Sequence, residues 1–309
     1  MTGSRLTAVD GSQEKVPSAA NQSVRFDNAL VGVDGTSSGR DAIALADLLR
    51  DDGGRLTLAY VVLTHTPSYQ NFYATPAWEQ SREMLERERE AAGVTAELTG
   101  MFSPSVGSGL HQLAEDCDAD LLVVGSCSRG AVGRVLVDDA RDTVSGTSCP
   151  VAVAPHGYGE QRHQLRTIGV AYNDTVEADV ALSVARSLAA RCGSPVRALT
   201  VVTPASGGLG RWGDFDVGWG EMVNAVEQAA KDRLHSLDGV DGHVAIGPAA
   251  EALVAFGDEV DLLVVGSRGF GPLRRLILGS TSLQLTREAR CPLVVVPRPA
   301  IAPNLRERS

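Results

Sequence analysis

An internal repeat constrains this chain more than any other feature of its sequence. Residues 261–282 read DLLVVGSRGFGPLRRLILGSTS, and residues 120–141 read DLLVVGSCSRGAVGRVLVDDAR, so the two blocks are offset by 141 positions. Similar Cys-Pro segments, CPVAVAP at 149–155 and CPLVVVP at 291–297, end the two halves. One long period of this kind predicts two copies of the same fold, not a solenoid of short repeats.

Apolar runs alternate with helical patterns in each half. The expected strands are 29–33, 55–63, 94–98, 121–125 and 151–154, then 168–171, 196–202, 243–246, 262–265 and 293–296. This alternation needs crossover connections and hence a mostly parallel sheet. The strands are nearly all apolar, which indicates that helices cover both faces. We therefore expect two repeated doubly wound α/β domains, each a five-stranded mostly parallel sheet with helices on both faces.

The same pattern sets the expected boundaries. They are a disordered N-terminal extension at 1–24, a first domain at 25–155, a linker at 156–164, a second domain at 165–298 and a tail at 299–309. Within the domains, 79–92 reads as a charged, solvated helix. The aromatic-containing segment before it and the Gly/Trp-rich segment 203–220 read as loops.

Composition excludes several classes of function. The chain has 309 residues, 43% of them apolar, a formal net charge of −10 and a pI near 5.1, which argues against a nucleic-acid-binding surface. No apolar run approaches the roughly 20 residues of a membrane helix, and the first 24 residues contain no hydrophobic segment typical of a secretory signal. The five cysteines are widely spaced, without a C-x-x-C pair. Neither disulfides nor zinc are indicated, and we expect a cytoplasmic protein.

The second half contains a pattern suited to phosphate. After the apolar run come Gly266, Gly269 and the pair Gly279-Ser280, which gives G-x2-G-x9-G-S. Glycines let backbone N–H groups approach a ligand closely, and a helix beginning at Gly279-Ser280 favours an anion at its N-terminus. Ser280 and Thr281 add hydroxyl donors. The alternative is that the glycines only turn the chain and Ser280 is an ordinary N-cap. No Gly-Lys-Ser/Thr P-loop and no G-x-G-x-x-G dinucleotide fingerprint is present in this turn.

The duplicated fold, the Val-Gly-Val-Asp-Gly-Thr segment at 31–36 and the G-x2-G-x9-G-S block resemble a tandem universal stress protein. The resemblance covers both halves, 29–155 and 167–297. It implies ATP as the ligand, with or without magnesium, its phosphates on the motif and its adenosine on the acid after the first strand and residues near the end of the second strand. The residues of the second half implied in this site are Ala171, Val201, Gly266, Ser267, Arg268, Gly269, Gly279, Ser280 and Thr281.

The first half departs from the motif. It keeps the acid after its first strand, Asp34, but Ser128 replaces the second glycine and Asp138-Asp139 replaces the Gly-Ser pair. A carboxylate is a good helix N-cap. It also repels phosphate, by roughly 4 kcal/mol at ~4 Å and an effective dielectric constant of ~20. We expect no ATP in this half.

The second half departs at the other end of the site. Val33 and Val170 are 137 positions apart, and this alignment places Ala171 where the first half has Asp34. Asn173 or Asp174 could reach the ribose instead. Losing one hydrogen-bonding acid should weaken binding by about 1–3 kcal/mol without abolishing it. We therefore expect one nucleotide per chain, in the second half.

Three classes of function stay open on the sequence. The first is a stress-response or regulatory protein that binds ATP or another adenine nucleotide. The second is a nucleotide-independent scaffold for protein partners, and the third is a weak ATP hydrolase. We find no catalytic constellation and no metal site in the sequence, which favours binding over catalysis. The resemblance also implies that the halves pair through their last strands as an internal pseudo-dimer, and that two chains can pair in turn.

Overall fold

The computed structural model describes residues 24–64, 70–126, 147–203, 216–267 and 279–297. The first half contains β1 (Asn28–Gly32), α1 (Ser37–Leu49), β2 (Arg55–Leu63), α2 (Gln70–Ala92), β3 (Glu97–Ser103), α3 (Val106–Asp116), β4 (Leu121–Gly125) and β5 (Val151–Ala154). The second contains β6 (Ile168–Ala171), α5 (Val176–Cys192), β7 (Val196–Val202), α6 (Asp216–His235), β8 (Val240–Ile246), α7 (Ala249–Gly257), β9 (Leu262–Gly266), α8 (Ser280–Glu288) and β10 (Leu293–Val296). The linker holds the short 3-10 helix η3 (Tyr158–Glu160).

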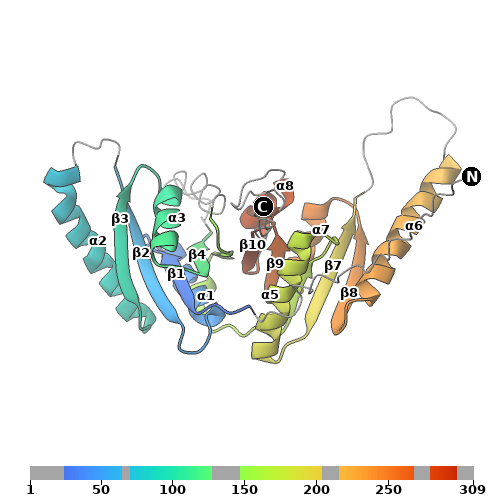
Figure 1. Ribbon diagram of the computed structural model, residues 1–309, viewed down its shortest axis with the longest axis horizontal. Coiled ribbons are helices and arrows are strands. Elements are labelled where there is room, and N and C mark those ends of the chain that lie inside the picture. Colours follow the sequence, from blue (N-terminus) through green and yellow to red (C-terminus); the bar gives the residue numbers. More distant parts are fainter. Residues whose placement is uncertain (1–23, 65–69, 127–146, 204–215, 268–278, 298–309) are drawn as a thin grey trace, which may run out of the picture.

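The ten strands form one continuous sheet in the order β3-β2-β1-β4-β5-β10-β9-β6-β7-β8 (Figure 1). Pairing is parallel within each half, and the single antiparallel pair of this sheet is β5 with β10. The halves are thus joined through their last strands, as the family resemblance implies. The expected fold class, two doubly wound α/β units with five strands each, is confirmed.

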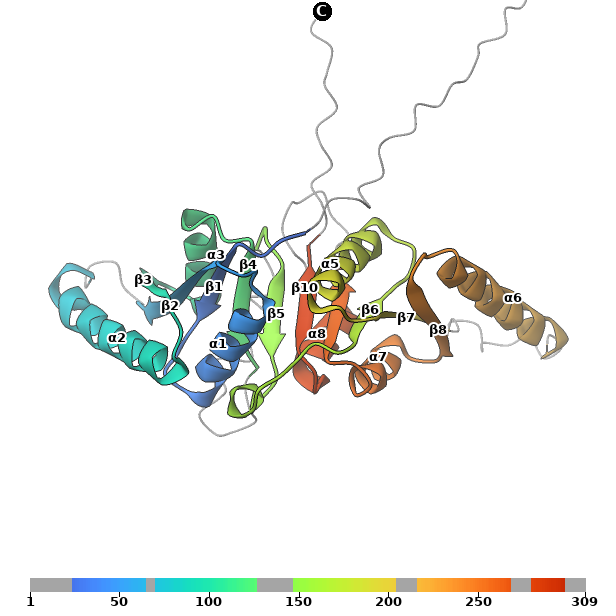
Figure 2. The same cartoon turned by 90° about the horizontal axis from the view of Figure 1, so that it is seen from below.

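Helices cover both faces of the sheet, and Figure 2 shows them flanking it in each half. One buried cluster contains side chains from α1, α2, α5 and α6, and a second contains side chains from α3, α7 and α8. Neighbouring strand residues alternate between the clusters, as with Ala29 and Val31 in the first and Leu30 in the second. Each cluster includes residues of both halves, so the two halves share both layers of their core.

Polar contacts also join the halves. The Arg191 guanidinium, at the end of α5, donates to the Asp51 carboxylate at 2.7 Å and to the backbone oxygens of Leu48 and Leu49 at 3.0 and 2.8 Å. In this way a cation from the second half satisfies carbonyls at the C-terminus of a first-half helix. The buried carboxylate of Asp41, on α1, accepts from linker N–H groups at 2.9 and 2.7 Å.

Several elements differ from the expected boundaries, among them β8, which was expected at 243–246 and runs Val240–Ile246. The third strand was expected at 94–98 but runs Glu97–Ser103, and α6 begins at Asp216, inside the segment expected as a loop. Helix α2 begins at Gln70 and contains Pro76, although a proline inside a helix removes one intrahelical hydrogen bond. Glycines likewise weaken a helix by about 1 kcal/mol each without forbidding it, which explains the early start of α6.

Cys149 and Cys291 are buried free thiols, as expected from the apolar strands that follow them. Cys127, Trp212 and Phe215 lie outside the described residues. No helix among the described residues is long and apolar enough to cross a membrane.

Candidate functional site

In the second half the strand order reverses at β6, which is hydrogen-bonded to β9 on one side and to β7 on the other. Ala171 ends β6 and Gly266 ends β9, so the carboxyl ends of these two strands lie side by side. In doubly wound sheets, ligands bind beyond the carboxyl ends of the strands at such a switch point. The candidate site lies there.

Strand pairing corrects the alignment of the two halves at this edge. Gly32 pairs with Ala59 in the first half, and Ala171 pairs with Leu199 in the second. The N–H groups of the following residues, Val33 and Tyr172, donate to the same two carbonyls. The offset is therefore 139 and not 137, and the expectation that Ala171 replaces Asp34 is wrong.

The counterpart of Asp34 is Asn173. Asp34 Oδ1 accepts from the Thr36 hydroxyl at 2.7 Å, and Asn173 Oδ1 accepts from the Thr175 hydroxyl at 2.8 Å. Each threonine is in turn the N-cap of the following helix. The second half thus keeps the same side-chain turn and replaces a carboxylate with an amide of the same shape.

The N-terminus of α8 forms the polar wall of the site. Gly279 is its N-cap residue and supplies no side-chain acceptor to the first turn. The first N–H groups of a helix have no intrahelical partner, so they and the helix dipole favour an anion. Ser280, Thr281 and Ser282 add three hydroxyls in succession, and the Ser282 hydroxyl lies 3.5 Å from the backbone oxygen of Gly266.

Gly266 has a packing role that is independent of any ligand. A Cβ at this position would lie 2.8 Å from the Cβ of Glu177 and 2.9 Å from the Glu177 backbone. A Cβ at Gly125 would likewise collide with Ser38, at the start of α1. Gly266 allows α5 to start against the end of β9, and Gly125 allows α1 to start against the end of β4, so the glycine itself does not distinguish the halves.

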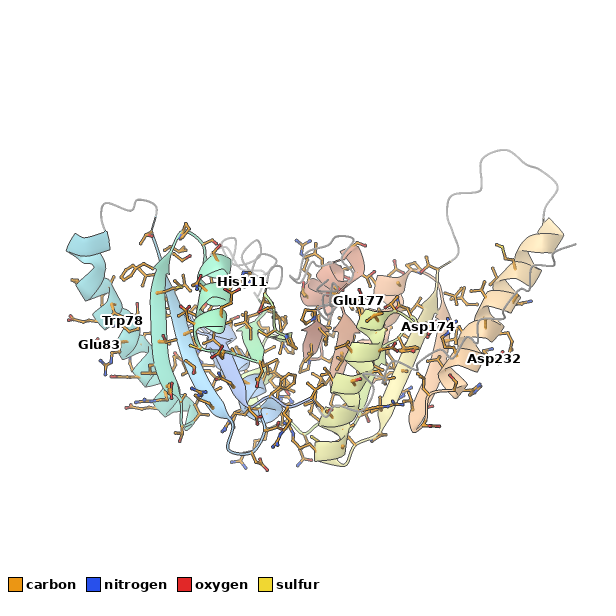
Figure 3. The ribbon with its side chains drawn as sticks, in the orientation of Figure 1. Trp78, Glu83, His111, Asp174, Glu177 and Asp232 are labelled. Atoms are coloured by element: carbon orange, nitrogen blue, oxygen red, sulfur yellow. The ribbon has the colours of Figure 1, made fainter. Side chains whose placement is uncertain are left out.

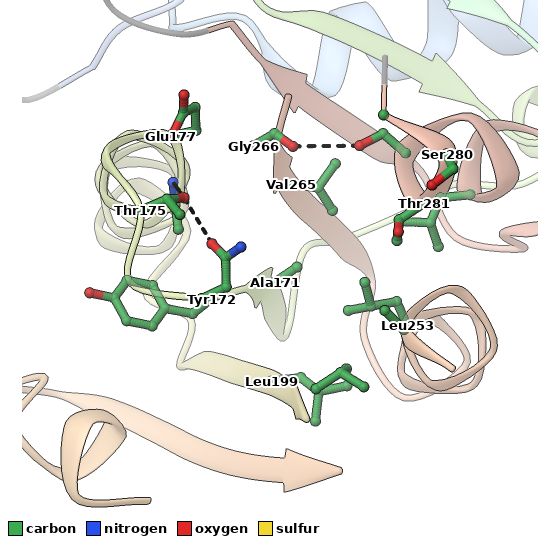
Figure 4. A pocket seen from close by; sticks show the side chains of 17 residues that line it. Ala171, Tyr172, Thr175, Glu177, Leu199, Leu253, Val265, Gly266, Ser280 and Thr281 are labelled. Carbon is green, nitrogen blue, oxygen red and sulfur yellow. Dashed lines mark hydrogen bonds between the residues drawn. The ribbon is translucent and has the colours of Figure 1, made fainter. Parts of the chain in front are cut away.

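Together these elements enclose a cavity of about 320 Å³ (Figure 4). Its apolar wall comes from β7, α7, β9 and α8 and faces the polar residues of β6–α5 and the α8 N-terminus. It is lined by Ala171, Tyr172, Asn173, Thr175, Glu177, Ala178, Leu199, Val201, Ala249, Leu253, Val265, Gly266, Gly279, Ser280, Thr281, Ser282 and Leu285. A cavity with one apolar wall and a few convergent polar groups suits a small molecule with a planar apolar part and an anionic part.

Acidic side chains near the cavity have distinct surroundings. Glu177, at the N-terminus of α5, lines the cavity. Asp174 lies on the side toward α6 (Figure 3) and pairs with Arg233 at 3.0 Å. Asp179 accepts from the Tyr172 hydroxyl at 2.9 Å. Burial raises the pKa of Tyr172 to about 12, and the bond to Asp179 contributes. That hydroxyl is therefore neutral at physiological pH.

The structure brings together most of the residues expected in the site. Ala171, Val201, Gly266, Gly279, Ser280 and Thr281 all line the cavity. Ser267 is buried, and its N–H donates to Val296 in the neighbouring strand. Arg268 and Gly269 lie outside the described residues, as do Ser128, Asp138 and Asp139 of the first half. No group of His, Cys, Asp or Glu in the described part of the chain is arranged to hold a metal ion.

Several lining residues were not expected in the site. Leu253 comes from α7 and Leu285 from α8, where their helical spacing indicates only a buried face. Glu177 reads as an ordinary acidic residue in a first helical turn, which complements the helix dipole. Asn173 and Thr175 correspond to Asp34 and Thr36 only when the two halves are aligned with an offset of 139. The capping threonines at the starts of α1 and α5 are the sequence signal for this offset.

The fold and the cavity define a class of protein: paired α/β units with a cavity at the switch point of one sheet. The chain belongs to the universal stress protein family, whose model matches residues 25–155 and 164–297. The tandem family resemblance seen in the sequence is thereby confirmed.

Individual relatives agree with this assignment. A universal stress protein of Mycobacterium tuberculosis is 27% identical over 263 residues, covering 78% of this chain and 89% of the relative. A second from the same organism is 26% identical over 293 residues, covering 86% and 95%. The crystal structure of a universal stress protein from Archaeoglobus fulgidus has a TM-score of 0.60 and 20% identity, with 89% of this chain and 97% of that one covered, which supports the fold alone.

Proposed function

We propose that this protein binds ATP, or another adenine nucleotide, in the cavity of its second half as a stress-response or regulatory protein. The observation that carries the proposal is the position of the α8 N-terminus, with Gly279 as N-cap, against an apolar wall at the switch point. The adenine ring fits the apolar wall formed by residues such as Val201 and Leu253. The phosphates fit the helix N-terminus, where N–H groups and three hydroxyls converge.

Asn173 supports a ribose position between these two ends. Its Oδ1 is held by the Thr175 hydroxyl, which leaves the amide oriented beside the cavity that it lines. An amide offers both a donor and an acceptor to ribose hydroxyl groups. The corrected alignment therefore removes the deficit that an alanine at this position would impose, and strengthens the proposal for the second half.

The decisive experiment is a calorimetric titration of the full chain with ATP. The test variant, Gly279→Asp/Ser280→Asp, reproduces the sequence of the first half at the start of α8. Two carboxylates at ~4 Å from phosphate should reduce affinity by more than about a hundredfold. The matched control is Gln284→Glu, which adds negative charge to the same helix outside the cavity lining and should bind as wild type does.

The outcomes separate the three functions. Saturable binding to wild type and the control, lost in the double variant, supports the nucleotide site. Absence of binding to wild type, or equal binding by the double variant, overturns it and favours a nucleotide-independent scaffold. Release of phosphate above the buffer background during the titration identifies a hydrolase, and Glu177→Gln then tests the one carboxylate in the described cavity lining.

A further inference from the structure

One end of the molecule exposes an apolar surface. Five large apolar side chains of the described residues are exposed, and three of them lie on the outermost helix and strand of the second half, α6 and β8. They are Met222 (51% exposed), Val226 (48%) and Ile246 (49%). None of the three lines the cavity at the switch point, so nucleotide binding does not account for their exposure.

The equivalent end of the first half is charged. Helix α2 and strand β3 form that end, and α2 and α6 lie at opposite extremes of the molecule (Figure 1 and Figure 2). The exposed residues of α2 between 79 and 90 are all charged or polar: Glu79, Gln80, Arg82, Glu83, Arg87 and Glu90. A polar outer face is the ordinary form of a helix that packs on a sheet. The apolar face of α6 departs from it, as interaction surfaces do.

The exposed apolar residues of α6 form a stripe along one side of the helix. Its members are spaced alternately by three and four residues: Trp219, Met222, Val226, Ala229 and Arg233. Met222, Val226 and Ala229 are exposed, whereas Ala230 and Leu234 are buried on the adjoining side, which packs on the sheet. A stripe with this spacing, here called the α6 stripe, is the kind of seam along which two helices pack at a shallow angle.

The α6 stripe is complementary to a second copy of itself when the two helices run in opposite directions. If the two-fold axis passes between positions 222 and 226, Met222 of one chain meets Val226 of the other. In the same register Trp219, the largest residue of the stripe, falls opposite Ala229, the smallest. Pairing of large with small residues across facing positions is how two helices fill the space between them.

The charges along α6 favour the same direction. The first part of the helix carries Asp216 and Glu221, and the last part carries Lys231, Arg233 and His235, with Asp232 as the one acid among them. An antiparallel pair therefore brings the acidic end of each helix to the basic end of the other, and it also opposes the helix dipoles. A parallel pair would place Arg233 against its own copy. Arg233 pairs with Asp174 of its own chain but stays half exposed.

We propose that α6 is the interface through which two copies of this chain form an antiparallel dimer. Such an interface is isologous, because the same stripe contributes from both chains. Ile246 extends the apolar surface: Val240 and Val244 pack on the cluster that α6 covers, and alternation along β8 places Ile246 on the same face. Helix α6 has 20 residues, roughly 30 Å, so we expect a weak dimer that depends on concentration.

The test is the mass of the full chain in solution, measured by sedimentation equilibrium over a range of protein concentrations. Wild type should dimerise with a dissociation constant below about 100 μM. Met222→Lys and Val226→Glu should each raise this constant by more than about a hundredfold, because each places two unpaired charges in the interface of a dimer. The matched control is Asn224→Lys/Gln228→Lys, at exposed positions on the other side of the same helix, and it should dimerise as wild type does.

A mixture of the two charged variants tests the direction of pairing. In the antiparallel register the new ammonium of a Met222→Lys chain lies beside the new carboxylate of a Val226→Glu chain. The mixture should therefore form one-to-one dimers at least about tenfold tighter than either variant alone. Since both positions are exposed, every variant should also melt at the wild-type temperature.

Three results would overturn the proposal. The first is wild type with the mass of one chain at every concentration up to about 100 μM, which would leave a different protein as the partner of the α6 stripe. The second is dimerisation of Met222→Lys and Val226→Glu at the wild-type concentration, which would place the interface elsewhere. The third is a mixture whose mass is the average of its two components.

Discussion

Asn173 gives the residue-scale test of where an adenosine would lie. Asn173→Asp keeps the side-chain shape and the Thr175 bond but makes the acceptor charged. Hydrogen bonds to charged groups are worth about 1 kcal/mol more than neutral ones, so adenosine should bind about fivefold to tenfold more tightly. Asn173→Ala should bind it more weakly. Adenosine is the right probe in calorimetry because it has no phosphate to be repelled. Equal affinities for all three proteins would place the ribose elsewhere.

Gly266 makes a prediction about stability in the absence of ligand. Gly266→Ala places a methyl group 2.8–2.9 Å from Glu177, so the start of α5 must shift. We expect a loss of about 1–3 kcal/mol in the free energy of unfolding, measured by urea denaturation. Gly125→Ala, at the equivalent contact in the first half, should cost a similar amount. Wild-type stability in both variants would contradict the packing role.

The misplaced alignment at Asp34 has a physical cause. Side chains on a strand alternate between faces with a period of two. A slip of two residues, such as 137 instead of 139, therefore keeps every apolar side chain on the correct face. The apolar pattern predicts the strands but cannot separate these two registers. The capping threonines, Thr36 and Thr175, are the local signal that does.

At the scale of elements, the sequence predicted the strand–helix order and the position of the cavity but not every boundary. Strand β3 was expected too early because Gly100 interrupts its apolar pattern. The structure explains that glycine: a Cβ there would collide with the ring of Trp78, on α2, and with the backbone oxygen of Tyr60, on β2. Contacts of this kind join residues far apart in sequence, so local propensity cannot reveal them.

The contact between the C-termini of α5 and α1 makes an element-scale prediction about pH. Burial raises the pKa of Asp51, but hydrogen bonds from Arg191 and the Phe26 N–H outweigh it, and the net pKa is below the usual value. A carboxylate whose pKa is depressed in the folded state stabilises the protein at pH values above its pKa in the unfolded state, which is near 4. This stabilisation is lost as the pH falls through the pKa of the folded state. Asp51 is 13% exposed, so Asp51→Asn should cost about 1–3 kcal/mol at pH 7.

The check is urea denaturation at a series of pH values. The difference in stability between wild type and Asp51→Asn should be constant from pH 7 to about pH 5 and shrink below about pH 4. Asp47→Asn is the matched control, because its carboxylate pairs with Arg50, the C-cap residue of the same helix, and is 46% exposed. A difference that does not change with pH would mean that the Asp51 charge does not hold the two helices together.

At the scale of the whole molecule, the pairing of the halves came from the family resemblance and not from residue patterns. Nothing in the apolar segments 151–154 and 293–296 specifies that they pair with each other or in which direction. The antiparallel register of β5 and β10, with Ala152 opposite Val294, depends on the complete shape of both sheets. The consequence is a sheet whose outer strands are β3 and β8 and whose centre is the junction.

A continuous sheet with shared cores should unfold as one unit. Leu45 lies on α1 and is fully buried in a cluster that also contains Leu188, on α5 of the second half. Leu45→Ala should cost about 2–5 kcal/mol. If the halves unfold together, amide exchange in β9, far from the change, should accelerate by the same free energy as exchange in β1. Leu188→Ala is the reciprocal control and should accelerate exchange in β1. Wild-type protection of β9 in Leu45→Ala, measured by hydrogen-exchange mass spectrometry, would mean that each half unfolds alone and that the β5–β10 pair separates without unfolding either core.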